Sequence, residues 1–400
     1  DIAARRAGKR PTVSASASTG YSWTVAGGTT TDTGSGSLSL SYNQRLFDNL
    51  RTDAQIDQAR AFADVASQGL RNAEQNVLLS AATAYVDVVR DTELTSLRSD
   101  NVSFLQAQVQ SAQDRLSIGE GTRIDLSQAE ARLAQAVASY RSAVNSLQAS
   151  RASYARWVGH APSGLSSGFA FGAMLPASLD AALYAADNNH PAILSAQAQV
   201  EAARYGTDAA LRAFGPTLDL VGSISSSFST TGTSPSAMGS VRLSLSIPLY
   251  SGGALGSSAR RASLAQTQSE LDALLTRNEV RESVIAAWSG VQTAIAQIES
   301  AQSAVGASQI ALDGVIEERN VGQRTTLDVL NARAELTSAR EALISAKASR
   351  LVAAFSLIAA TGRLSAAELH LPVTIRSAAG YTNAVEDVWR ELRTVDEVLN

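Results

Sequence analysis

The residue types that support catalysis or metal binding are scarce in this chain of 400 residues. There is no cysteine, which excludes disulfides, thiolate metal sites and cysteine nucleophiles. The three histidines, His160, His190 and His370, lie in separate linker-like segments. The glycine-rich stretch 251–253 lacks the lysine and the spacing of a phosphate-binding loop. We therefore expect no catalytic residues, no metal site, no cofactor and no enzymatic activity.

Composition and charge exclude further classes. The net charge of −4 provides no basic field, so we expect no nucleic-acid partner. No run of 18 or more apolar residues is present, so we expect no transmembrane helix, although a β-barrel would give a weaker, alternating signal. The hydrophobic fraction is 45% but aromatic residues make up only 5%, which favours closely packed, alanine-rich helices.

The positions of these helices follow from a two-fold internal repeat. Leu46 corresponds to Leu249 and Asp125 to Asp328, with a separation of 203 residues in both cases. The segment 119–126 returns as 322–329 with glycine, threonine and aspartate in the same places. This offset is too long for a solenoid unit. It indicates a duplicated half-molecule.

Each copy is expected to contain two strands followed by two long helices. In the first repeat, residues 1–161, we expect strands at about 12–25 and 36–46 and helices at about 48–118 and 123–158. A linker or equatorial segment, 162–188, follows. In the second repeat, residues 189–362, we expect a helix at about 189–214, strands at about 216–229 and 238–249, and helices at about 251–320 and 325–361. Residues 363–400 form a C-terminal equatorial segment in which Val385, Val388, Trp389 and Leu392 suggest a short amphipathic helix.

The long helices have the apolar pattern of coiled coils. In the return helices, large residues alternate with alanine at three- and four-residue spacing, as in Leu126, Ala129, Leu133 and Ala136. The flanking faces are polar: Gln128, Glu130, Arg132, Gln135 and Ser139 in the first copy, Asn331, Arg333, Glu335, Thr337 and Ser338 in the second. Helices with water on two sides are typical of a hollow tube rather than a solid bundle.

The four expected strands alternate apolar and polar residues. Such strands suit either a membrane barrel or a soluble antiparallel sheet, and the strands alone leave both interpretations open. Four strands cannot close a barrel, since the smallest membrane barrels use about eight. Because open edges are not tolerated in lipid, several chains would have to share one barrel. Three copies would give twelve strands, but the sequence does not choose three over two or four.

The order of these elements resembles the TolC family of outer-membrane channel proteins, over nearly all of residues 1–365. The motifs that carry the resemblance are 46–48 (Leu-Phe-Asp), 189–191 (Asn-His-Pro), 215–218 (Gly-Pro-Thr-Leu), 248–253 (Pro-Leu-Tyr-Ser-Gly-Gly) and the tips 119–126 and 321–332. The resemblance implies an α+β membrane protein: a homotrimer with a 12-stranded outer-membrane β-barrel, four strands per chain, continued by a long α-helical coiled-coil tunnel in the periplasm of a Gram-negative cell.

The same resemblance implies function and partners. The chain would be the outer-membrane exit duct of a tripartite efflux or type I secretion system. Its partners would be two further copies, a periplasmic adaptor (membrane fusion) protein, an inner-membrane ABC or proton-driven pump, and outer-membrane lipid. The alternative is a soluble coiled-coil structural or periplasmic adaptor-like protein. Adaptors usually have one helical hairpin, whereas this chain has two, each preceded by a strand pair, and this difference disfavours the alternative.

The resemblance also implies a periplasmic gate near the tips. Asp328 matches an aspartate of an acidic ring, Arg324 an arginine that links across, and Asp125 its acidic partner in the first repeat. A second ring aspartate is replaced by Asn331, and an aromatic gate residue by Arg319, so weaker attraction of cations is expected. The alternative for both aspartates is a helix cap, and the two roles are compatible.

Two further sets of residues follow from the resemblance. The tips would contact the adaptor through Gly119, Gly121, Thr122, Gly322 and Thr325, although plain helix caps would use the same residues. Tyr21 and Trp23 would belong to an aromatic girdle at the membrane surface. Because the first repeat is shorter than the second at its start, we also expect a precursor with more residues, including a secretory signal.

Overall fold

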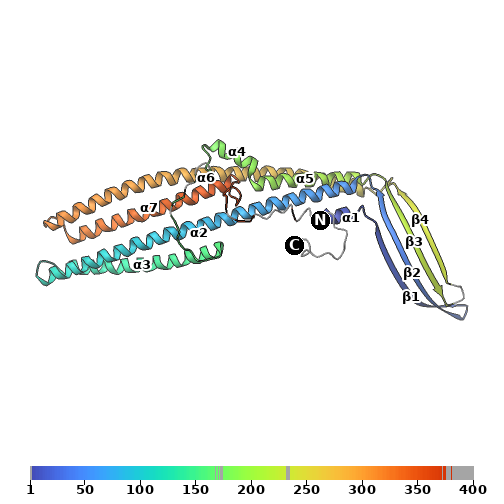
Figure 1. Ribbon diagram of the computed structural model, residues 1–400, viewed down its shortest axis with the longest axis horizontal. Helices are drawn as coiled ribbons and strands as arrows, with labels where there is room; N and C mark the ends of the chain where they lie inside the picture. Colours follow the sequence, from blue (N-terminus) through green and yellow to red (C-terminus); the bar gives the residue numbers. More distant parts are fainter. Residues whose placement is uncertain are drawn as a thin grey trace. The chain divides into compact units, whose positions relative to one another are not determined.

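The computed structural model describes residues 2–166, 168–169, 171, 174–230, 235–371, 373–374 and 380 (Figure 1). The expected amphipathic helix near Trp389 lies outside the described residues. The elements are α1 (Ile2–Ala7), β1 (Thr12–Ala26), β2 (Thr29–Phe47), α2 (Arg51–Ser117), α3 (Arg123–Val158), α4 (Leu179–Asn189), α5 (Pro191–Arg212), β3 (Thr217–Ser229), β4 (Ser236–Ser246), α6 (Ala254–Asn320) and α7 (Thr326–Ala360).

The chain forms two compact units, and each unit draws residues from both sequence repeats. Of the described residues, the first unit contains those within 2–69 and 194–276, and the second contains those within 70–193 and 277–373. The first unit holds the strands. Its strands form a single antiparallel sheet of order β1-β2-β3-β4, in which β2 of the first repeat pairs with β3 of the second (Figure 1).

The β1–β2 hairpin is longer than the sequence predicted. The expected loop before residue 36 is strand instead, and the pairing continues to Ala26 opposite Thr29. The turn is the two-residue sequence Gly27-Gly28, with φ values of 58° and 84°. Two adjacent residues at positive φ give the tight turn whose twist matches that of paired strands, and glycine adopts it without steric cost. Threonines 29–31 then extend the strand because β-branched residues suit a pleated sheet.

The sheet has one hydroxyl-rich face and one apolar face. Serine hydroxyls form cross-strand hydrogen bonds between Ser14 and Ser41 at 2.6 Å and between Ser16 and Ser39 at 2.7 Å. The second strand pair repeats this arrangement between Ser223 and Ser240, at 2.9 Å. The other face carries the exposed apolar residues Val13, Trp23, Val25, Leu38, Leu40, Ile224, Phe228, Val241, Leu243 and Leu245. A single chain therefore leaves its apolar sheet face uncovered.

Strand passes into helix through the same backbone conformation in both repeats. Asn49 and Leu50 have φ values of 58° and 62°, and their counterparts Gly252 and Gly253 have values of 62° and 82°. In the first repeat, the carboxylate of Asp48 accepts the backbone N–H of residue 52 at 2.9 Å and so caps the start of α2. The first corner therefore places two non-glycine residues in a region that glycine occupies more readily.

The second unit consists mainly of helical hairpins. Leu105 of α2, Ala129 and Ala136 of α3, and Leu330 of α7 form one buried cluster. A second cluster joins α6 to α7. At the other end of α7, the segment predicted as a linker contains α4, whose Ala182 and Ala186 are fully buried against α6 and α7. The small side chains of α4 allow this close packing, and the sequence alone did not reveal the helix.

One described helix, α7, is long and apolar enough to cross a membrane by length and composition, with a mean hydropathy of 1.5 over 18 residues. A third of that window is buried inside the protein, and core helices meet the same criterion. Its buried residues include Leu336, Leu357 and Ile358, which pack within the second unit. The packing therefore assigns α7 to the helical core.

Candidate functional site

Both helical tips end with the same glycine turn. Gly119 after α2 and Gly322 after α6 have φ values of 82° and 83°. In the first tip, the N–H of Glu120 donates to the carbonyl of Arg115 at 2.9 Å, five residues back. The second tip repeats this hydrogen bond from residue 323 to residue 318, at 2.8 Å. This pairing is the usual way in which a left-handed glycine satisfies the last carbonyls of a helix.

The return helices both begin with a reciprocal cap. The N–H of Asp125 donates to the hydroxyl of Thr122 at 3.1 Å, and the N–H of Thr122 donates to the Asp125 carboxylate at 3.2 Å. Thr325 and Asp328 form the same pair at 3.2 and 2.9 Å. Hydrogen bonds from Thr325 lower the pKa of Asp328. Both aspartates therefore cap helices in the single chain, as the sequence alternative predicted.

Two predicted gate arginines lie in different surroundings. Arg324 forms an exposed ion pair with Glu318 at 2.7 Å, so in one chain its partner is on its own hairpin rather than Asp125. Hydrogen bonding to that carboxylate raises the pKa of Arg324. Arg319 has a buried Nε with no hydrogen-bond partner among the described residues. Burial, followed by the positive charge of Arg115, lowers the pKa of Arg319.

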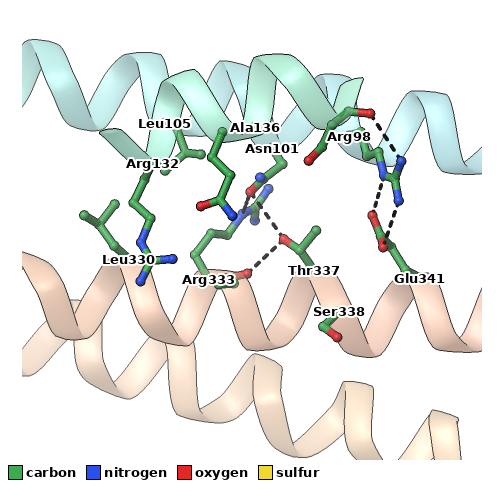
Figure 2. Close-up of a pocket in the computed structure, with 13 residues that line it drawn as sticks. Arg98, Asn101, Leu105, Arg132, Ala136, Leu330, Arg333, Thr337, Ser338 and Glu341 are labelled. Atoms are coloured by element: carbon green, nitrogen blue, oxygen red, sulfur yellow. Dashed lines mark hydrogen bonds and ion pairs between the residues drawn. The ribbon is translucent and has the colours of Figure 1, made fainter. Parts of the chain in front are cut away.

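Behind the tips, a cavity of about 220 Å³ lies between α2, α3 and α7 (Figure 2). Arg98 of α2 spans it and donates to both carboxylate oxygens of Glu341 on α7, at 2.7 and 3.2 Å. Arg98 also donates to the carbonyl of Ser139 on α3, at 3.2 Å. A bidentate arginine–carboxylate contact fixes the relative orientation of the two side chains in addition to pairing their charges. This residue pair therefore joins the two hairpins of the chain.

Among the described residues, the remaining two arginines of the cavity donate hydrogen bonds to neutral acceptors. Arg333 donates to the side-chain oxygen of Asn101 at 3.3 Å, and its guanidinium lies 4.5 Å from the ring centre of Phe104. Burial lowers the pKa of Arg333. Arg132 donates to the side-chain oxygen of Asn331 at 3.1 Å. The predicted gate position Asn331 thus contacts the first repeat directly, and an aspartate there would neutralise Arg132.

The sequence prediction missed this network. It placed Arg132 and Arg333 on polar faces and did not bring them together. A signal was present in the repeat: Arg132 and Glu130 correspond, by the 203-residue offset, to Glu335 and Arg333. Charge is therefore reversed at both positions. Such a reversal indicates that the two sides of a hairpin meet different neighbours.

The predicted aromatic girdle residues lie near the turn of the β1–β2 hairpin. Tyr21 and Trp23 are 65% and 69% exposed and share the apolar face of β1 with Val25. Large exposed aromatic residues on an apolar sheet face are typical of a strand end at a membrane surface.

Comparison with known proteins identifies the family. The model of the outer membrane efflux protein family matches residues 1–160 and 182–363. The chain belongs to this family. It is 36% identical over 363 residues to outer membrane efflux protein BepC of Brucella suis biovar 1 (strain 1330), covering 90% of this chain and 79% of that protein. It is 25% identical over 348 residues to outer membrane protein TolC of Escherichia coli (strain K12), covering 83% of this chain and 70% of TolC.

A solved structure has the same fold. CusC superposes with a TM-score of 0.79 at 20% sequence identity, over 90% of this chain and 85% of CusC. As an outer membrane efflux protein, the chain is an export channel of the Gram-negative outer membrane that extends into the periplasm. The alternative, a soluble coiled-coil or adaptor-like protein, is therefore wrong. The TolC-family resemblance inferred from the sequence motifs is confirmed.

Proposed function

We propose that three copies of this outer membrane efflux protein share one 12-stranded barrel and one helical tunnel, as an exit duct for efflux or type I secretion. The observation that carries this proposal is the incomplete sheet: β1 and β4 are its edges, and one face is apolar while the other is lined with serine. Unpaired edges are not tolerated in lipid. Pairing β4 of one chain with β1 of the next removes every edge.

In this assembly the apolar face contacts outer-membrane lipid and the serine face lines the lumen. Tyr21 and Trp23 form the girdle at the end of the barrel that carries the β1–β2 turn. The serine hydroxyls offer hydrogen bonds to water without adding charge. The lumen of the barrel would then be wet but weakly selective, and selectivity would depend on the tunnel entrance.

The entrance lies at the tips, where we assign a gate to Asp125, Arg319, Arg324, Asp328 and Asn331. Three copies place Asp328 in a ring, and Arg324 can exchange Glu318 for Asp125 of another helix when chains meet. Arg319 and Asn331 add positive charge and remove negative charge relative to the family pattern. A gate of this composition should attract cations only weakly.

The tip glycines Gly119, Gly121 and Gly322, with Thr122 and Thr325, form the proposed contact surface for a periplasmic adaptor. An inner-membrane pump of the ABC or proton-driven type would supply the energy, so the chain itself would perform no catalysis and need no cofactor. The tips suit this role because Gly119, Thr122 and Gly322 are exposed while the caps fix the conformation of the backbone.

The experiment combines mass and conductance. We expect the purified protein in detergent to have the mass of a trimer, to dissociate on SDS gels only after heating, and to form ion-conducting pores in planar lipid bilayers. A monomer that stays soluble without detergent and gives no pores would overturn the proposal.

A further inference from the structure

We propose that the cavity between α2, α3 and α7 is a binding site for a small oxyanion, of the phosphate or carboxylate class, held between Arg132 and Arg333. This inference goes beyond the export function and depends only on contacts within one chain. The cavity of about 220 Å³ is lined by three arginines and a single carboxylate, Glu341 (Figure 2).

The charges around the cavity do not balance. The Glu341 carboxylate already accepts two hydrogen bonds from Arg98, at 2.7 and 3.2 Å. No carboxylate among the described residues forms an ion pair with Arg132 or Arg333, whose side-chain contacts are the amide oxygens of two asparagines and one aromatic ring. Two guanidinium groups in the cavity therefore have no carboxylate bound to them among the described residues.

A further arginine, Arg340, adds to the positive charge around Arg333. Positive charge on Arg340 further lowers the pKa of Arg333, and Asp100 opposes that effect only in part. Arg340 itself donates to the amide oxygen of Gln309 at 2.8 Å, so it too meets a neutral acceptor. An anion in the cavity would offset both the burial of Arg333 and the repulsion from Arg340.

Polar side chains also line the cavity. The Thr337 hydroxyl is engaged within the protein, 2.8 Å from the carbonyl of Arg333 and 3.3 Å from the side-chain oxygen of Asn101, whereas Gln135 and Ser338 add further polar groups to the wall. Guanidinium groups on facing helices, with the polar side chains of Gln135 and Ser338 in the same wall, match the oxygens of a phosphate or carboxylate. An anion seated there would connect α3 to α7, and hence the first hairpin to the second.

The sequence repeat supplies an internal comparison. By the 203-residue offset, Arg98, Arg132 and Arg333 correspond to Ala301, Glu335 and Glu130. The counterparts of the three cavity arginines are therefore two glutamates and one alanine, and none of them is an arginine. The basic cavity is specific to the seam between the two hairpins of one chain, so substitutions at Glu130 and Glu335 are matched controls.

Isothermal titration of the detergent-solubilised protein with pyrophosphate and with citrate, at constant ionic strength set by sodium chloride, tests the site. We expect saturable binding at one site per chain. Arg132→Gln and Arg333→Gln should each weaken binding about tenfold or more, the usual effect of losing a charge-assisted hydrogen bond. Asn331→Asp should weaken it similarly by giving Arg132 a carboxylate. Glu130→Gln and Glu335→Gln should change affinity less than about twofold.

The controls separate a lost site from a lost fold. Helix content of each variant by circular dichroism should match the parent protein, and Arg132→Lys should bind more tightly than Arg132→Gln because it keeps the charge. No saturable binding by the parent protein, or equal losses in the arginine and glutamate variants, would overturn the proposal. Because binding is measured without a membrane, its failure would leave pore formation intact and distinguishable.

Discussion

The two repeats of this chain agree in backbone and differ in charge. At both tips a left-handed glycine is followed three residues later by a threonine that caps the next helix. Yet Leu116 and Gly121 of the first tip correspond to Arg319 and Arg324 of the second. At the tips, the residues that fix the chain direction are therefore the same in both copies, whereas residues that can face neighbouring helices differ. The duplicated scaffold could thereby acquire two kinds of helix contact.

The largest effect should come from the apolar core, where the repeats differ in burial. Leu336 is 1% exposed, and its counterpart Leu133 is only half-buried in the single chain. Leu336→Ala should cost about 2–5 kcal/mol of unfolding free energy, because a fully buried leucine leaves a cavity. Leu133→Ala should cost less. Thermal denaturation followed by circular dichroism compares the two, and the reverse order would contradict the assigned burial.

A substitution at the strand-to-helix corner of the first repeat should increase the stability of the protein. Leu50→Gly should stabilise the protein by about 1 kcal/mol, since Leu50 has a φ of 62° that glycine adopts more easily. Gly253→Ala, at the equivalent position, should destabilise it by a similar amount. The same denaturation measurement applies. A loss with Leu50→Gly would show that contacts of the leucine side chain outweigh its backbone strain.

The helix caps should respond equally in the two repeats. Thr122→Ala and Thr325→Ala should each cost about 1 kcal/mol, the usual value of an N-cap. Thermal denaturation measures both losses of unfolding free energy. Clearly unequal losses would show that the two caps are not equivalent.

The stability that the second cap contributes should also depend on pH, because hydrogen bonds from Thr325 lower the pKa of Asp328. Its contribution is complete above the ordinary aspartate pKa and is lost as pH falls through the lowered folded value. The stability difference between the parent protein and Thr325→Ala should therefore shrink at acidic pH, leaving the part that comes from the hydrogen bond between the Asp328 N–H and the Thr325 hydroxyl. A difference of the same size above and below the protonation of Asp328 would contradict this assignment.

The smallest effect on stability, and the clearest on transport, should follow from Arg324→Ala. The ion pair with Glu318 is exposed, so its loss should change denaturation little. If Arg324 helps to close the entrance, single-channel conductance in bilayers should increase. Arg204→Ala, which removes a similar surface pair with Glu201 on α5, is the control. Unchanged conductance in Arg324→Ala would remove this residue from the gate.

Much of this architecture could be predicted from the sequence, because long helices and their caps have strong local signals. Gly119, Thr122 and Asp125 mark a turn and a capping box by residue type alone. Gly27-Gly28 is also a turn signal, but the polar residues that follow it favour a longer loop when the sequence is considered alone. The pairing of β2 with β3 and the meeting of Arg132 with α7 depend on contacts between distant segments, which a single sequence does not encode locally.

One chain holds an incomplete sheet, and we propose that other copies complete it. Within a chain, β1 and β4 are separated by two strands, or roughly 14 Å at about 4.8 Å per strand, too far for a disulfide. Because the chain has no cysteine, Ser14→Cys, Ser16→Cys or Ser18→Cys on β1, each combined with Ser240→Cys on β4, gives a clean cross-linking panel. Oxidation should yield a covalent trimer for at least one pair. Monomer bands alone across the whole panel would contradict the account.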